Sequence, residues 1–216
     1  MEPTPGGGRM EPVCHIGVQA VERLRTLDLT PSDLYEPLKG AAAEARLSTQ
    51  LDAPGMAGFT FWSRANRFFR ERLQRQGWTY SNAQNILRTF HPSGLMAITA
   101  ISGAGKVMDE NASWSGEVRA KNPKGSAIRQ LVQRNFEQLP LFEIPTWFLL
   151  YKSTESGLLF ELSLPVDMHD DYVDTWRERI ILTDNPLTGP KYDIKKLDEA
   201  PAEKAVVVPV QFKGVM

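Results

Sequence analysis

The chain has 216 residues, of which 42% are hydrophobic and 24% charged, and its formal net charge at pH 7 is −1. A globular chain of this length buries one sizeable core without disulfides or metals, and a single domain is the default. The longest apolar runs, residues 144–151 and 206–210, are far shorter than the ~20 residues of a membrane-spanning helix, which excludes that class of protein.

The N-terminus and the cysteine content favour a soluble, cytoplasmic protein. Residues 1–12 are rich in proline and glycine and lack the basic and apolar pattern of a secretory signal, so we expect a disordered start. Cys14 is the single cysteine in the sequence, which excludes an intramolecular disulfide and a multi-cysteine zinc site.

Two helical patterns open the chain, over residues 13–27 and 30–49. The second has a strong start, because Thr30 can cap the helix, a proline suits its first position and Asp33 completes a capping box. Pro37 and the glycine three residues later predict that this helix is kinked or split.

The clearest helix is expected over residues 60–76, after a breaker-rich loop at 52–58. Its aromatic residues fall on one stripe, and most of its arginines fall outside that stripe. Arg72 projects into the stripe, where a charge must find a carboxylate, reach solvent or face a ligand, and pairing within the core is the expected outcome. Gly77 supplies the helix stop.

Beyond Trp78 the pattern changes to β-structure. The expected elements are a strand at 95–101, a polar loop at 102–125, a helix at 126–138, a hairpin of strands 146–152 and 158–164, a short strand at 179–183 and an edge strand at 205–212. Helices first and strands afterwards predict an α+β fold, with N-terminal helices followed by a mainly antiparallel sheet. We expect a single domain over 13–185 and a turn-rich C-terminal extension over 186–216.

The net charge of −1 conceals a segregation of charge along the chain. Residues 59–134 hold 12 Lys/Arg against four Asp/Glu, which is a net +8, whereas residues 1–58 carry −3 and residues 135–216 carry −6. A basic middle allows a positive face that could meet nucleic acid or an acidic partner. Alternatively, the acidic ends fold over the middle and neutralise it.

The preferred hypothesis is a nucleic-acid-associated binding or accessory protein that contacts DNA or RNA and needs no cofactor. Residues 121–125, Lys-Asn-Pro-Lys-Gly, place two lysines and exposed backbone N–H groups before a helix start, where phosphates bind favourably. The tryptophan of the polar loop could stack on a base or fold back onto the core. The expected contacts are Arg64, Arg67, Arg70, Arg75, Trp114, Arg119, Lys121, Lys124 and Arg129.

A second hypothesis is a metal-dependent nuclease. Glu117 and Lys121, with Asp109 or Glu110, could supply the carboxylates that hold Mg²⁺ and the lysine that positions the attacking water. The usual spacing places the lysine two residues after the glutamate, but here Arg119 takes that position and Lys121 lies four residues on. Mg²⁺ is expected only under this hypothesis.

Two other motifs lack residues that their chemistry needs. Residues 102–106, Ser-Gly-Ala-Gly-Lys, lack both the first glycine of an ATPase phosphate loop and the Ser/Thr after the lysine. Glu161 and the acidic run 167–171 form a competing carboxylate pair, in which Ser163 stands where the nuclease lysine is needed.

A third hypothesis is a protein-interaction subunit. The run Val206–Phe212 in the tail 191–216 could add a strand to a partner's sheet, or close this chain's own sheet as an edge strand. No pattern indicates an oligomeric state.

Five segments together resemble a family of uncharacterised bacterial proteins associated with mobile elements and their neighbouring genes. They are Arg88–Gly94, Lys121–Gly125, Thr146–Leu150, Glu161–Pro165 and Trp176–Leu182. The resemblance covers roughly residues 55–185. Because the family has no assigned activity, the resemblance implies a nucleic-acid or phage-defence setting and no catalytic residue.

Overall fold

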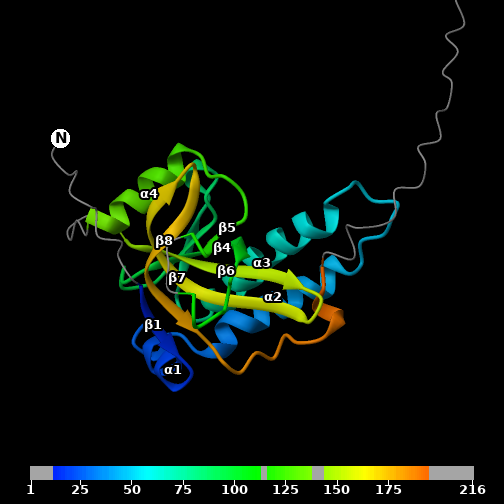
Figure 1. The fold of residues 1–216 in the computed structure, drawn as a ribbon, viewed down its shortest axis with the longest axis horizontal. Helices are drawn as coiled ribbons and strands as arrows, with labels where there is room; N and C mark the ends of the chain where they lie inside the picture. Colours follow the sequence, from blue (N-terminus) through cyan, green and yellow to red (C-terminus); the bar gives the residue numbers. More distant parts are fainter. Residues whose placement is uncertain (1–11, 113–115, 138–143, 195–216) are drawn as a thin grey trace, which may run out of the picture.

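The computed structural model describes residues 12–112, 116–137 and 144–194. Figure 1 shows helices packed on both faces of a central sheet. The helices are α1 (Val18–Arg25), α2 (Pro31–Ala45), α3 (Met56–Gln74) and α4 (Ser126–Glu137), with short 3-10 turns η1 (Ala83–Asn85) and η2 (Pro190–Tyr192). The strands are β1 (Val13–Ile16), β2 (Thr79–Ser81), β3 (Arg88–Phe90), β4 (Ala97–Gly105), β5 (Val118–Ala120), β6 (Thr146–Thr154), β7 (Gly157–His169) and β8 (Tyr172–Ile181).

The described strands form one mixed, eight-stranded sheet in the order β1-β8-β7-β6-β4-β3-β2, with β5 paired to β4. The α+β class is confirmed, but the expectation of helices followed by a mainly antiparallel sheet is right only in part. β1 precedes the helices and pairs with β8 in parallel, and β4 pairs with β6 in parallel. The second parallel pair follows from the crossover through α4, since parallel neighbours cannot be joined by a tight turn.

The expected helix over residues 13–27 is wrong in its first turn. Residues Val13–Ile16 form β1, and Gly17 then adopts φ +58 before α1 begins at Val18. A four-residue segment with apolar residues at both ends fits a strand as well as a helical turn, and here pairing with the edge of β8 decides between them.

The start of α2 is as expected, since Thr30 and Asp33 form the complete capping box. The predicted split is absent, because α2 runs unbroken through Pro37. Close packing on α3 stabilises it: a β-carbon at Gly40 would lie only 3.0 Å from the ring of Phe68. Helix α3 begins at Met56, inside the expected loop, and Gly77 ends it with φ +85.

Strand residues alternate between two apolar clusters on the two faces of the sheet. Trp147 and Leu149 point towards α1, α2 and α3, whereas Phe148 and Leu150 point towards α4. Side chains of successive strand residues project to opposite faces, which produces this division. The sheet is therefore the middle layer between two groups of helices.

Several strands extend beyond their apolar sequence signals. The polar stretch 102–125 is only partly a loop, because it contains the end of β4 and all of β5, which pair with each other. The β6–β7 hairpin closes through two residues, 155–156, instead of five, and β8 begins at Tyr172 instead of Arg179. Pairing with neighbouring strands organises these polar residues.

The predicted disordered start, apart from Pro12, and the predicted edge strand 205–212 lie outside the described residues. Within the part of the chain that the structure describes, no helix is long and apolar enough to cross a membrane.

Candidate functional site

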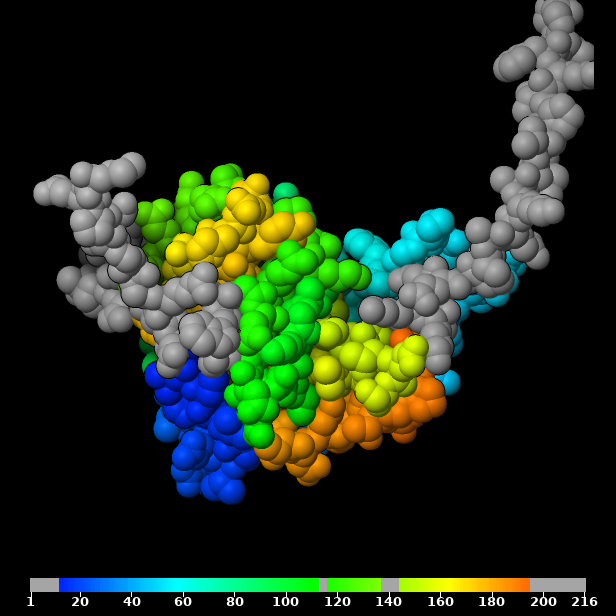
Figure 2. Space-filling model, viewed as in Figure 1, coloured from blue at the N-terminus to red at the C-terminus, as the bar shows by residue number. Residues whose placement is uncertain are grey.

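A cleft of about 750 Å³ lies at the carboxyl ends of the parallel strands β4 and β6. Its other walls are the start of α3, residues 84–87 and the loop that leads from β5 into α4. Figure 2 shows the green β4–β5 region beside the yellow-green β6–β7 hairpin, with the cyan start of α3 nearby. Ligands of α/β sheets bind at this kind of place, beyond the carboxyl ends of strands whose flanking helices lie on opposite faces.

Three lysines line the cleft, Lys121, Lys124 and Lys152, and none of the described lining residues is acidic. Burial lowers the pKa of Lys124, and this side chain forms no ion pair with any described residue. The ammonium of Lys152 donates a 2.5 Å hydrogen bond to the carbonyl oxygen of Gly105. Three cations without a carboxylate among them make this cleft attractive to an anion.

The N-terminus of α4 adds backbone donors to the same wall. Gly125, immediately before α4, lines the cleft, and a β-carbon added there would meet nothing within 4 Å. The first N–H groups of a helix have no partner within the helix, and they carry partial positive charge. The loop and the helix start together resemble the elements that hold phosphate in other proteins.

The wall opposite the lysines is aromatic and comes from α3. Phe59 and Trp62 line the cleft with ring centroids 5.7 Å apart, and Phe59 is 60% exposed. Phe61 packs on Tyr151 of β6 with centroids 4.7 Å apart, which closes the base of this wall. The cleft therefore offers an apolar, aromatic side and a cationic side.

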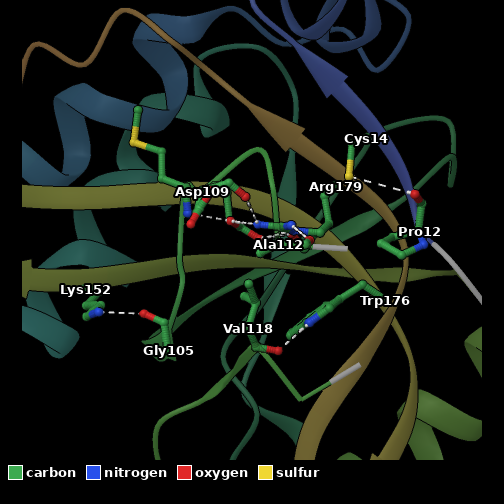
Figure 3. A network of polar contacts seen from close by, with 12 residues as sticks. Pro12, Cys14, Gly105, Asp109, Ala112, Val118, Lys152, Trp176 and Arg179 are labelled. Atoms are coloured by element: carbon green, nitrogen blue, oxygen red, sulfur yellow. Dashed lines mark hydrogen bonds and ion pairs between the residues drawn. The ribbon is translucent and has the colours of Figure 1, made fainter. Parts of the chain in front are cut away.

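A buried ion pair holds the β4–β5 connection, which follows the cleft-lining end of β4 at Gly105 (Figure 3). Arg179 and Glu161 are each 1% exposed, and their side chains form two hydrogen bonds, of 2.9 and 2.7 Å. Arg179 also donates to the carbonyl oxygen of Ala112 at 2.5 Å, and the N–H of Met108 donates to Glu161 at 2.7 Å. The indole of Trp176 donates to the carbonyl oxygen of Val118 at 2.8 Å. These contacts fix the connection at several points.

Two buried asparagines attach the helices on either side of the cleft to the sheet. Asn66 of α3 donates to the carbonyl oxygen of Ala100 at 3.2 Å and accepts from its N–H at 3.1 Å. Asn135 of α4 bonds the N–H and the carbonyl oxygen of Thr146 in the same way, each at 3.0 Å. Both walls are thus held to strands that reach the cleft.

The chain matches no protein-family model, no curated protein and no solved structure. Its function is therefore inferred from the cleft's own residues.

Most of the predicted contacts on α3 are engaged by the protein itself. Arg64 pairs with Glu44 at 2.6 Å and Arg67 with Glu71 at 2.7 Å. Arg70 donates to Asn82 at 2.8 Å and lies over the ring of Tyr80. Arg75 is exposed at the end of α3 and does not line the cleft. The positive face therefore does not centre on this helix.

Arg72 behaves as the sequence predicted, because it pairs with the buried Asp33 at 2.6 Å. Like the pair of Arg64 with Glu44, this contact joins the basic middle of the chain to its acidic N-terminal segment. The acidic segments thus neutralise part of the basic middle, while the cleft lysines are left without acidic partners among the described lining residues.

Of the remaining predicted contacts, two line the cleft and two interact with residues outside its lining. Lys121 and Lys124 line it, Arg119 lies over the ring of Tyr172, and Arg129 pairs with Asp171 at 2.5 Å. Trp114 lies outside the described residues.

Lys121 does not join the two nuclease carboxylates, Asp109 and Glu117, which both lie near Lys106 instead. Glu117 pairs with Lys106 at 2.6 Å, and Lys121 follows the opposite end of β5, which places their α-carbons ~13 Å apart at the usual rise of a strand. Asp109 accepts from the N–H of Asn111. Among the described residues no group of three or more His, Cys, Asp or Glu could hold a metal ion. The nuclease hypothesis stays a prediction that this geometry does not favour.

Sequence reasoning missed Lys152, Phe59 and Trp62 as site residues. Lys152 ends a predicted strand, and only the parallel pairing of β6 with β4 brings it to the cleft. The sequence pattern places Trp62 in the core stripe and Phe59 before the expected helix start. The loop of residues 121–125 is the part that the sequence did signal, through its lysines, proline and glycine.

Proposed function

We propose that this protein binds nucleic acid through the cleft at the carboxyl ends of β4 and β6. The observation that carries the proposal is the grouping of three lysines, Lys121, Lys124 and Lys152, on one cleft with no carboxylate among the described lining residues. Partial burial lowers the pKa of Lys124, and a partly buried ammonium without a counter-charge is suited to bind an anion from outside. A phosphate backbone supplies such anions in a row.

The aromatic wall supports nucleic acid over a simple inorganic anion. A small anion needs only cations and N–H donors, whereas a nucleotide also has a flat apolar part that fits beside aromatic rings. The role is that of a binding or accessory protein, and no catalytic step is part of it. The bacterial mobile-element or phage-defence setting belongs to the same proposal and rests on the sequence resemblance alone.

The test is the salt dependence of binding to labelled oligonucleotides, measured by fluorescence anisotropy. Replacing Lys124 by Gln removes one cation from the cleft and is expected to weaken binding and lower the salt slope by about one. Lys39→Gln is the matched control, because Lys39 is an exposed lysine of α2 that pairs with Glu36 outside the cleft. Equal binding by the two variants contradicts the proposal.

A protein partner at the tail stays a separate prediction, since residues 195–216 lie outside the described part of the chain. If neither DNA nor RNA binds at low salt, the nucleic-acid proposal fails, and a protein partner for the same cationic cleft becomes the next hypothesis.

A further inference from the structure

The two kinds of side chain in the cleft come from opposite faces of the sheet. Phe59 and Trp62 belong to α3, which packs on one face. Lys121 and Lys124 lie in the loop before α4, which packs on the other, and Lys152 shares the strand face of Leu150 towards α4. A ligand that spans the cleft therefore meets rings at one side and cations at the other.

That division matches a nucleotide whose base is free of its partner strand. In a duplex the flat faces of the bases are stacked and hidden, so a protein reaches only phosphates, sugars and base edges. Aromatic side chains can stack on a base only where it is unpaired and turned outward. An exposed phenylalanine beside a tryptophan thus gives no advantage with duplex DNA.

The rim of the cleft also offers groups for the edge of a base. Gln84 and Asn85 are exposed, line the cleft and adopt left-handed backbone angles, with φ +57 and +59. Side-chain amides donate and accept hydrogen bonds, as base edges do. Left-handed residues other than glycine are uncommon, and they gather at binding sites more often than elsewhere.

We infer that the cleft takes an unpaired nucleotide of single-stranded DNA or RNA, with its base on Phe59 and Trp62 and its phosphate at Lys121 and Lys124. The inference rests on the proposed function and narrows it to single strands. Duplexes contact only the cationic side of the cleft and bind more weakly.

The experiment compares three labelled probes of equal length at one salt concentration: a single strand, its blunt duplex, and a single strand of abasic sites. The full-length protein is expected to bind the single strand about tenfold more tightly than either of the others. The abasic strand keeps the phosphates and removes the bases, so it isolates the contribution of stacking.

Phe59→Ala is the decisive variant, because Phe59 is mostly exposed and its loss leaves the core intact. It is expected to lose about tenfold in affinity for the single strand and to bind the abasic strand as the unmodified protein does. Phe136→Ala is the matched control: Phe136 is 54% exposed on α4 and does not line the cleft. Circular dichroism and thermal unfolding verify that both variants fold.

The outcomes separate this inference from the proposed function. Single-strand preference that Phe59→Ala abolishes supports the inference. Equal binding of single strand, duplex and abasic strand, each weakened by Lys124→Gln, overturns the inference and keeps the proposed function. Binding to none of the probes overturns both.

Discussion

The backbone N–H of Lys124 donates a hydrogen bond to the carbonyl oxygen of Asp171 at 2.7 Å. The tight turn between β7 and β8 therefore holds the lysine loop beside the cleft. Asp171 adopts φ +65, and its carboxylate pairs with Arg129 of α4 at 2.5 Å. The residue thus positions one cation through its backbone and neutralises another through its side chain.

Asp171→Asn separates these two effects. Asparagine accepts left-handed backbone angles, so the backbone hydrogen bond from Lys124 remains. The guanidinium of Arg129, in contrast, loses its carboxylate partner, and its positive charge is no longer neutralised. We expect oligonucleotide affinity to rise about two- to fivefold at low salt and stability to change by less than about 1 kcal/mol, as for other exposed pairs. The control is Asp28→Asn, at another left-handed aspartate, which contacts His91 and does not line the cleft. Unchanged affinity in Asp171→Asn means that Arg129 lies beyond the reach of the ligand.

As pH rises, oligonucleotide affinity should decline at a lower pH than lysines with an ordinary pKa would produce. Burial lowers the pKa of Lys124, and a phosphate ligand needs the protonated form. Affinity is therefore complete while Lys124 is protonated and declines as pH rises through its depressed pKa, below the ordinary 10.5. Lys124→Arg keeps the charge and should move this decline to higher pH. Affinities measured from pH 7 to 10 test this, with Lys39→Arg as the control that leaves the profile unchanged.

The sequence predicted the local parts of the site better than the distant ones. The lysine loop and the start of α4 are adjacent in the chain, so their residue types indicated a phosphate-binding arrangement. The compensation of Arg64 by Glu44 was only an open alternative, because it depends on α2 and α3 lying side by side. Arg72 was predictable because a charge inside an apolar stripe must be paired.

Acid should destabilise the contact between α2 and α3. Burial alone raises the pKa of Asp33, but hydrogen bonds from Thr30 and the guanidinium of Arg72 outweigh it, and the net pKa lies below the ordinary 3.8. A depressed folded-state pKa contributes stability above the unfolded-state value, and this is lost as pH falls through the folded-state value. Urea unfolding between pH 6 and 3 should show this loss, and Asp33→Asn should flatten it.

Asp33→Asn should also lower stability at pH 7 by about 1–3 kcal/mol, since charge-assisted bonds to a buried carboxylate are lost. The chain provides a matched control in Asp52, which accepts from the N–H of Thr49 in a similar but exposed arrangement. Asp52→Asn is expected to lower the free energy of unfolding at pH 7 by less than about 1 kcal/mol. Equal losses in the two variants would mean that burial and Arg72 add nothing to the Asp33 contact.

Removing one partner of the Glu161–Arg179 pair should be strongly destabilising. Glu161→Gln leaves a guanidinium in a site that is 1% exposed, and breaking such a pair costs about 3–5 kcal/mol. Replacing both residues, as Glu161→Gln with Arg179→Met, should cost less than the sum of the single changes. Urea unfolding of the two single variants and the double variant measures this difference. Trypsin should also cleave Glu161→Gln faster after Lys106, because the β4–β5 connection that the pair holds becomes looser. Strictly additive losses would contradict the coupling.

The mixed sheet could not be predicted because its two parallel pairs join strands distant in the chain. β1 pairs with β8 across more than 150 residues, and nothing in the residues Val13–Ile16 specifies that neighbour. For the same reason the sequence did not indicate the contact by which Arg179 reaches back to the carbonyl oxygen of Ala112. Buried polar groups that bond across such separations leave no periodic signal.

Two left-handed glycines line the cleft and differ in what surrounds them. A β-carbon at Gly105, with φ +76, would lie 1.9 Å from the carbonyl oxygen of Glu117, whereas at Gly55, with φ +81, it would meet nothing within 4 Å. Gly55→Ala should therefore lower the free energy of unfolding only through backbone strain, by about 1–2 kcal/mol. Gly105→Ala adds a backbone clash that must displace β5, so we expect a loss greater than about 3 kcal/mol.

Gly105→Ala should also weaken oligonucleotide binding at temperatures where the variant is still folded. The carbonyl oxygen of Gly105 accepts the hydrogen bond from Lys152, so displacing this residue moves a cleft cation. Gly55→Ala leaves the three lysines in place and should bind as the unmodified protein does. Anisotropy titrations of both variants, beside their urea unfolding curves, separate the effect on the cleft from the effect on stability. Normal binding by a folded Gly105→Ala would show that Lys152 does not need this anchor to act on the ligand.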